Sequence, residues 1–285
     1  MGTNRRPAVR GPAVRGAAAR AAANRPPVGA VLLSQADLVL DWLAELPPGG
    51  WATPSILPGW AVAELAEHVG AVLRSVAGTL ARSSAAGSSA ARPGTIADYL
   101  AGYPSAAGRI QDREVAAATG RAGSEILARL RAERAAAEAA IGADPSAGED
   151  VVVGSHGPIR AADFLVTRVI EVVVHADDLS RSVPDRPAVP LEPAALRITA
   201  RALAEVLAAR APGRSVEVRI PPYAAVQCVA GPRHTRGTPP NVVEADPVSW
   251  VRLAAGRLAW ADGVSTGAVA ASGDRSDISA LLPLL

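Results

Sequence analysis

Residues 168–179 read RVIEVVVHADDL, a run of valine and isoleucine that carries a glutamate and a histidine four residues apart. Because a helix turns about 100° per residue, the polar residues of this stretch fall within about 80° of one another. They are Arg168, Glu171, His175 and Asp178. The apolar residues fill the other sides. The stretch therefore predicts a helix with one ordered polar stripe.

Two interpretations of this stripe are open from the pattern alone. In the first, the stripe faces water, and Glu171 and His175 form a surface pair at i, i+4. In the second, both side chains bind one metal ion, because this spacing puts a carboxylate oxygen and an imidazole nitrogen on the same side of a helix. The pattern favours the first interpretation, since most such helices are simply amphipathic. A metal site needs a third ligand.

Histidine is rare in this chain, with only four, at positions 68, 156, 175 and 234. His68 lies on another predicted helix, at the edge of its apolar stripe. Taken alone, a histidine there is more often a core residue bonded to a carbonyl group. With Glu171 and His175 it would complete a two-histidine, one-carboxylate set, which keeps positions open for water or substrate. Such a set suits zinc, but also iron, nickel or manganese.

Apolar residues recur at helical spacing through much of the chain before Pro190. The predicted helices span residues 31–46, 60–82, 95–118, 124–142 and 161–181. Residues 142–158 read as irregular. Helices in this order with modest loops favour an up-down bundle of four or five over residues 30–190.

The pattern changes after the proline-rich residues 182–193. One helix is predicted over residues 194–210 and a Leu-rich helix over residues 276–285. Short β-branched runs predict strands at residues 215–220, 225–231 and 241–246. The fold class is therefore α+β, with a domain boundary near Pro190 and a smaller α+β domain over residues 191–285.

Composition limits the remaining possibilities. The whole chain has a formal net charge of +2, but residues 1–27 contain six arginines and no acid. The rest of the chain therefore carries about −4, so nucleic acid is not an expected partner. Residues 1–29 are predicted to be a disordered Arg/Ala/Pro-rich tail. A single cysteine, Cys228, excludes an internal disulfide and a cysteine-cluster metal site. Without an apolar run of about 20 residues or a secretion signal, no membrane span and a cytoplasmic location are expected.

Two motifs resemble a known family. Residues 53–69, TPSILPGWAVAELAEHV, and residues 168–179 resemble, in order and separation, the two signatures of the mycothiol-dependent maleylpyruvate isomerases, members of the DinB-like helical bundle group. The resemblance implies that His68, Glu171 and His175 bind a divalent ion, usually taken as zinc. It also implies that Arg168 and Asp178 lie near the ion, where they either support these ligands or pack the helix. Together the two motifs outweigh the interpretation of the stripe as a solvated surface.

The C-terminal part, from about residue 215 to residue 285, resembles the bacterial sterol-carrier-like domain often fused behind this bundle. That name describes a fold and does not fix a ligand. In the isomerases this domain contributes an arginine toward the active site, and Arg233 or Arg236 in GPRHTRG are the candidates here. An exposed polar loop is an equally good interpretation of that segment.

Other reactive side chains carry less weight. His156 and His234 are possible acid-base groups, but more often such residues are loop histidines. Cys228 reads as a small core residue of a strand.

The resemblance implies a metal-dependent isomerase or thiol S-transferase, with mycothiol as the thiol cosubstrate and a small electrophile as the second substrate. A metal with an open position favours the thiolate form of an entering thiol. The alternative is a non-enzymatic binding protein that holds an apolar ligand in the sterol-carrier-like domain, with the bundle as scaffold. A third possibility is a regulatory partner. The sequence indicates neither the electrophile nor the oligomeric state.

Overall fold

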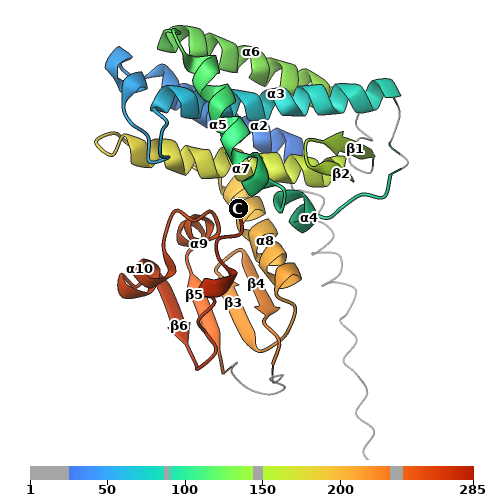
Figure 1. Cartoon of the computed structure of the whole chain (residues 1–285), viewed down its shortest axis with the longest axis vertical. Helices are drawn as coiled ribbons and strands as arrows, with labels where there is room; N and C mark the ends of the chain where they lie inside the picture. The colour runs from blue at the N-terminus through green and yellow to red at the C-terminus, as the bar shows by residue number, and fades with distance from the viewer. Residues whose placement is uncertain (1–25, 87–88, 90, 144–149, 232–239) are drawn as a thin grey trace, which may run out of the picture.

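The computed structural model describes residues 26–86, 89, 91–143, 150–231 and 240–285. Figure 1 shows a layer of long helices above a small sheet with its own helices. The predicted N-terminal tail lies outside the described residues over positions 1–25. The helical part consists of α2 (Val28–Ala44), η1 (Pro48–Ala52), α3 (Val62–Ala86), α4 (Ile96–Leu100), α5 (Tyr103–Ala118), α6 (Gly123–Gly142), the hairpin strands β1 (Val151–Gly154) and β2 (Gly157–Arg160), and α7 (Ala161–Ser182).

The bundle core forms where α2, α3, α6 and α7 pack against one another. Their apolar stripes meet in fully buried side chains such as Leu32, Leu65, Leu130 and Ile170. The contact between α3 and α6 is close, because a Cβ added at Gly70 would lie only 3.1 Å from the Leu130 side chain. Helix α5 crosses the outside of α3, as Figure 1 shows. This packing places one face of α3 and one face of α7 beneath α5.

The helical part departs from the sequence prediction in three places. Helix α2 begins at Val28 and not at residue 31. The single helix predicted over residues 95–118 is two, α4 and α5, because Pro104 lies in the first turn of α5 and cannot donate a backbone hydrogen bond to a preceding turn. The segment predicted as irregular contains the β1–β2 hairpin, whose tight turn uses Gly157 at φ +112°.

The C-terminal part contains α8 (Pro193–Arg210), β3 (Val216–Ile220), β4 (Ala224–Cys228), β5 (Val242–Ala245), α9 (Pro247–Ala254), α10 (Trp260–Ser265), β6 (Val269–Ser272) and η2 (Ser279–Leu281). The sheet order is β4-β3-β5-β6, with β3 and β5 parallel and the other pairs antiparallel. Alternate residues of β3 are buried, and α8 packs against β4 and α9. Asp246 caps α9 by accepting the amides of Val248 and Ser249. This α+β domain follows the bundle as predicted.

Two details of this domain differ from the prediction. Strand β6 was not predicted, since VAAS is short and carries only one β-branched residue. The Leu-rich helix predicted over residues 276–285 is wrong. Only the 3-10 turn Ser279–Leu281 forms, and Pro283 follows it, where a continuing helix would need a backbone N–H.

The two parts are joined by polar side-chain contacts as well as by residues 183–192, which connect α7 to α8. Gln35 of α2 is fully buried and bonds both the Pro190 carbonyl, at 3.0 Å, and the Glu192 amide, at 2.8 Å. Arg252 of α9 donates two hydrogen bonds to the Asp177 carboxylate of α7, at 2.6 and 2.9 Å. The C-terminal domain is therefore fixed against the last two turns of α7.

Across the described stretches of the chain, none of the helices combines the length and apolarity required to cross a membrane.

Candidate metal centre

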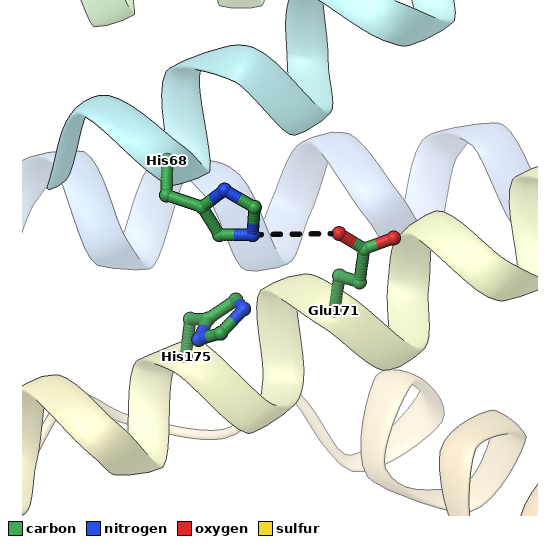
Figure 2. Close-up of side chains that lie close together, drawn as sticks. All are labelled: His68, Glu171 and His175. Carbon is green, nitrogen blue, oxygen red and sulfur yellow. Dashed lines mark ion pairs between the residues drawn. The ribbon is translucent and has the colours of Figure 1, made fainter. Parts of the chain in front are cut away.

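Three side chains from two helices converge beneath α5. His68 comes from α3, and Glu171 and His175 come from α7 (Figure 2). His68 Nε2 lies 3.6 Å from Glu171 Oε2, and the two imidazole rings meet edge to face with centroids 4.7 Å apart. One ligand atom from each residue lies within 4.8 Å of the others. The side chain of Glu171 is 12% exposed and those of the histidines are about as buried.

Glu171 is held in its charged form by two neighbours. Arg168 Nη2 lies 2.6 Å from Glu171 Oε1, and the Tyr103 hydroxyl donates to the same oxygen at 2.6 Å. Burial alone would raise the pKa of Glu171, but Arg168, His68 and Tyr103 hold it well below its ordinary range. The second oxygen of the carboxylate, Oε2, faces His68. Glu171 therefore presents a negatively charged oxygen to the two imidazoles.

His175 is oriented by Asp178, one turn further along α7. The ring atom Nδ1 lies 3.0 Å from Asp178 Oδ2. Asp178 is fully buried, and Arg257 of the C-terminal domain donates to both of its oxygens, at 2.9 and 3.1 Å. Burial lowers the pKa of His175 in spite of Asp178, so this imidazole is neutral near pH 7. A neutral ring with Nδ1–H bonded to Asp178 leaves the Nε2 lone pair free to bind a metal ion.

His68 lies between two carboxylates. Its Nε2 faces Glu171, its Nδ1 lies 3.7 Å from Glu114 Oε1 of α5, and Trp60 packs against the ring with centroids 5.5 Å apart. Burial alone would lower the pKa of His68, but Glu114 and Glu171 raise it above the ordinary value. In the absence of a cation this ring therefore attracts a proton.

The three side chains line a cavity of about 570 Å³. Its wall includes Tyr103, Arg109 and Arg113 of α5, Arg168 of α7, His156 of the β1–β2 turn, and Ala255 and Arg257 of the C-terminal domain. The cavity is therefore built by both domains, and guanidinium groups are frequent in its wall.

The donor set fits a divalent ion. Two imidazole nitrogens and one carboxylate oxygen are the usual protein ligands of catalytic zinc, and atoms that share an ion at roughly 2.1 Å lie about 3 to 4 Å apart. The separation of 3.6 Å between His68 Nε2 and Glu171 Oε2 agrees with this. An ion pair alone would explain why His68 and Glu171 meet, but it does not explain why His175 directs a second imidazole edge at the same point.

The structure brings together the three residues predicted as ligands. The polar stripe of α7 faces the cavity and the domain interface, with Arg168, His175 and Asp178 buried, and it does not face water. His156 also faces the cavity, where it packs on Tyr99 and Tyr103. The remaining candidates Arg233, His234 and Arg236 lie outside the described residues. Cys228 is fully buried on β4.

Sequence reasoning missed three residues at the centre: Tyr103, Glu114 and Arg257. Tyr103 and Glu114 lie on α5, where the polar run RIQDRE at residues 109–114 reads as a solvated helix surface. Arg257 follows α9 in a turn with Gly256 at φ +69°. None of the three belongs to either motif, so only the packing of α5 and of the C-terminal domain reveals them.

Comparison with known proteins agrees with this architecture. Residues 32–180 match the family model described as the mycothiol maleylpyruvate isomerase N-terminal domain, and residues 192–284 match the one described as a bacterial SCP ortholog. No curated protein matches the chain.

Two solved structures share the fold, and both are crystal structures of a mycothiol-dependent maleylpyruvate isomerase. A mutant of that enzyme is 15% identical, with a TM-score of 0.56 over 88% of this chain and 93% of that one. The other structure is 17% identical, with a TM-score of 0.53 over 81% of this chain and 88% of that one. Since its N-terminal family model covers residues 32–180 of 285, just over half of the sequence, the chain belongs to the mycothiol maleylpyruvate isomerase N-terminal domain family.

Proposed function

We propose that this protein holds a divalent ion through His68, Glu171 and His175 and uses mycothiol as cosubstrate, as an isomerase or an S-transferase acting on a small electrophile. The observation that carries the proposal is the convergence of these three side chains, within 4.8 Å of one another, in the wall of a cavity of about 570 Å³. The family model and the likeness to a mycothiol-dependent enzyme support mycothiol as the thiol.

Zinc is the ion that the donor set favours, since two imidazoles and one carboxylate form a common catalytic zinc site. Iron, nickel and manganese use the same ligands. When bound, the ion would lower the pKa of an entering thiol and so make a thiolate available near neutral pH.

The residues around the ligands keep them in the form that binds a cation. Arg168 and Tyr103 keep Glu171 ionised, and both bonds go to Oε1, which leaves Oε2 directed at the imidazoles. Asp178 accepts the Nδ1–H of His175 and thereby frees Nε2. The geometry of Glu171 and His175 is therefore set before an ion arrives, which lowers the cost of binding.

Two further cavity residues suit an anionic electrophile. Arg109 is exposed to the cavity, and no carboxylate partner for it is found among the described residues. It can pair with a carboxylate of the substrate. Burial and the nearby Arg168 and Arg109 lower the pKa of His156, which is neutral near pH 7 and can accept a proton there. Arg233 and Arg236 stay in the proposal as sequence-based candidates for the same pairing.

Cobalt substitution tests the proposal. We expect the Co²⁺-loaded protein to develop a thiolate-to-metal charge-transfer band when mycothiol is added, and the same preparation of His68→Ala to show none. If the wild-type protein binds Co²⁺ but gives no band, the thiol does not reach the ion and the mycothiol part of the proposal fails.

A second assay separates the two reaction types. The protein is incubated with mycothiol and with either maleylpyruvate or an alkylating electrophile, and the concentration of free thiol is measured over time. An isomerase regenerates the thiol, so its concentration stays constant while the double-bond geometry changes, whereas a transferase consumes one thiol for each electrophile.

The alternative of an apolar ligand inside the sterol-carrier-like domain has less support. The interior of that domain is filled by its own side chains, including Val218, Val243 and Trp250, which are all about 1% exposed or less. The indole of Trp250 donates to the Ala200 carbonyl of α8 at 3.1 Å and so closes the space between the two helices.

A further inference from the structure

Glu114 lies behind His68, on the opposite side of the ring from Glu171. It is fully buried near the end of α5, with Oε1 3.7 Å from His68 Nδ1. The neighbouring Arg113 donates to that same oxygen through Nε and Nη2, at 2.8 and 2.6 Å. A buried carboxylate is costly unless it is paired, so its position against a proposed metal ligand needs a physical reason.

Two buried atoms at this contact lack hydrogen-bond partners in the described part of the chain: His68 Nδ1 and Glu114 Oε2. An unsatisfied buried polar atom destabilises the folded protein, and native proteins contain few of them. The gap of 3.7 Å between ring and carboxylate exceeds a hydrogen bond by less than 1 Å. A small rotation of the imidazole would therefore satisfy His68 Nδ1.

The state of the His68 ring decides whether that bond forms. A neutral imidazole has one N–H, and a ring that binds a cation through Nε2 must carry this proton on Nδ1. The carboxylate that faces Nδ1 is Glu114. Asp178 has the same position relative to His175, at 3.0 Å from its Nδ1. Each of the two histidines thus has one carboxylate on the far side of its ring.

We propose that Glu114 is a positioning residue for His68, which accepts the Nδ1–H hydrogen bond and fixes the ring with Nε2 toward the proposed ion. This inference rests on the proposed metal site and adds to it a residue from α5, outside both sequence motifs. It makes the metal centre depend on three helices, because α5 orients a ligand supplied by α3.

Glu67 offers a matched control. It precedes His68 on α3, is 1% exposed, and its carboxylate oxygen Oε2 lies 3.5 Å from Arg129. Its other oxygen also lacks a hydrogen-bond partner within the described residues. Glu67→Gln and Glu114→Gln thus both remove one buried negative charge near His68, but only Glu114 faces the ring.

The test measures Zn²⁺ affinity by competition with a chromophoric chelator in the full-length protein. We expect Glu114→Gln to bind Zn²⁺ about tenfold more weakly than wild type, at the lower end of the usual loss because an amide oxygen still accepts a weaker bond. The Zn²⁺ affinity of Glu67→Gln is expected to stay within about threefold of wild type, because Glu67 does not face the ring. Circular dichroism of each metal-free variant checks the fold.

A second readout reports the hydrogen bond itself. In ¹⁵N-labelled, Zn²⁺-loaded protein, His68 is expected to carry its proton on Nδ1, and the resonance of this proton moves in Glu114→Gln but not in Glu67→Gln. Equal affinity losses in the two variants, or a His68 Nδ1 proton resonance that does not move in Glu114→Gln, would overturn the role of Glu114 while leaving the metal site intact. Wild-type protein that binds no metal would overturn the proposed function, and the role of Glu114 with it.

Discussion

Arg257 and Asp178 join the C-terminal domain to the proposed metal centre. Arg257 donates to both carboxylate oxygens of Asp178, at 2.9 and 3.1 Å, and one of these oxygens lies 3.0 Å from His175 Nδ1. A residue that follows α9 therefore reaches a proposed ligand on α7 through one intermediate side chain. The second domain is thus part of the site and contributes to the orientation of His175.

Removal of Arg257 is expected to weaken the proposed metal site without removing a proposed ligand. In Arg257→Ala, Asp178 loses two charge-assisted bonds and can rotate away from His175, so we expect Zn²⁺ affinity to fall by about tenfold. Chelator competition measures this. Arg219→Ala, which removes a guanidinium paired with Glu217 on the same strand, serves as the control and should bind as wild type does. Equal affinities for the two variants would contradict the coupling.

The pair of Arg252 and Asp177 is expected to stabilise the docking of the two domains. Asp177 is mostly buried, and without Arg252 its one remaining ion-pair contact among the described residues is Arg181, at 4.0 Å. Because Arg252 is 36% exposed, solvent screens part of the interaction, and we expect Arg252→Ala to cost about 1–2 kcal/mol.

Thermal unfolding of Arg252→Ala and Arg219→Ala measures this effect. The two arginines have equal side-chain exposure, 36%, but the Arg219 pair lies within one strand. A lower Tm is expected for Arg252→Ala alone. An equal fall in Tm in both variants would show that loss of a surface ion pair is enough to explain the effect, and that the domain interface makes no separate contribution.

Gly102 holds space for His156 at the cavity wall. A Cβ at this position would lie 2.5 Å from His156 Nδ1, so Gly102→Ala must displace the ring. We expect a loss of about 1–2 kcal/mol and slower turnover, with unchanged Zn²⁺ affinity. Gly108 lies inside α5, the helix that follows Gly102; Gly108→Ala meets nothing within 4 Å and is expected to stabilise by roughly 0.5–1 kcal/mol. Urea unfolding measures the free energy of unfolding of both variants. Similar changes in the two would contradict the contact between Gly102 and His156.

Cys228 is expected to be unreactive in the folded protein. Burial raises the pKa of its thiol to about 11, so near pH 8 only about one molecule in a thousand carries the thiolate. The thiolate fraction rises about tenfold per pH unit until the pH approaches this pKa. Iodoacetamide at pH 8 should label native protein very slowly and unfolded protein readily. Fast labelling of the native form would contradict this, and slow labelling excludes Cys228 as the source of a thiolate signal.

The spacing of Glu171 and His175 alone favoured a solvated stripe, and the three proposed ligands were predicted only through the resemblance of two short motifs to a known family. Glu171 and His175, one helical turn apart, lie in one motif and His68 lies in the other. Glu114, Tyr103 and Arg257 reach the site through the packing of α5 and of the second domain. That packing depends on long-range contacts that no local period encodes.

The errors in secondary structure have local causes. The break between α4 and α5 follows from Pro104, and the missing final helix from Pro283, each of which was present in the sequence but was outweighed by the helical pattern around it. The hairpin of β1 and β2 was missed because each strand has only four residues, which is too short for a clear alternation of apolar and polar residues.

The metal content of the purified protein tests the central claim most directly. After reconstitution with Zn²⁺ and removal of loosely bound ions, elemental analysis should find about one ion per chain in wild type and in His156→Ala. The second variant lacks a cavity histidine that is not a proposed ligand. His68→Ala and His175→Ala should retain almost none while keeping their helical circular dichroism spectrum. Wild-type protein without metal, or equal retention in His68→Ala, would contradict the account.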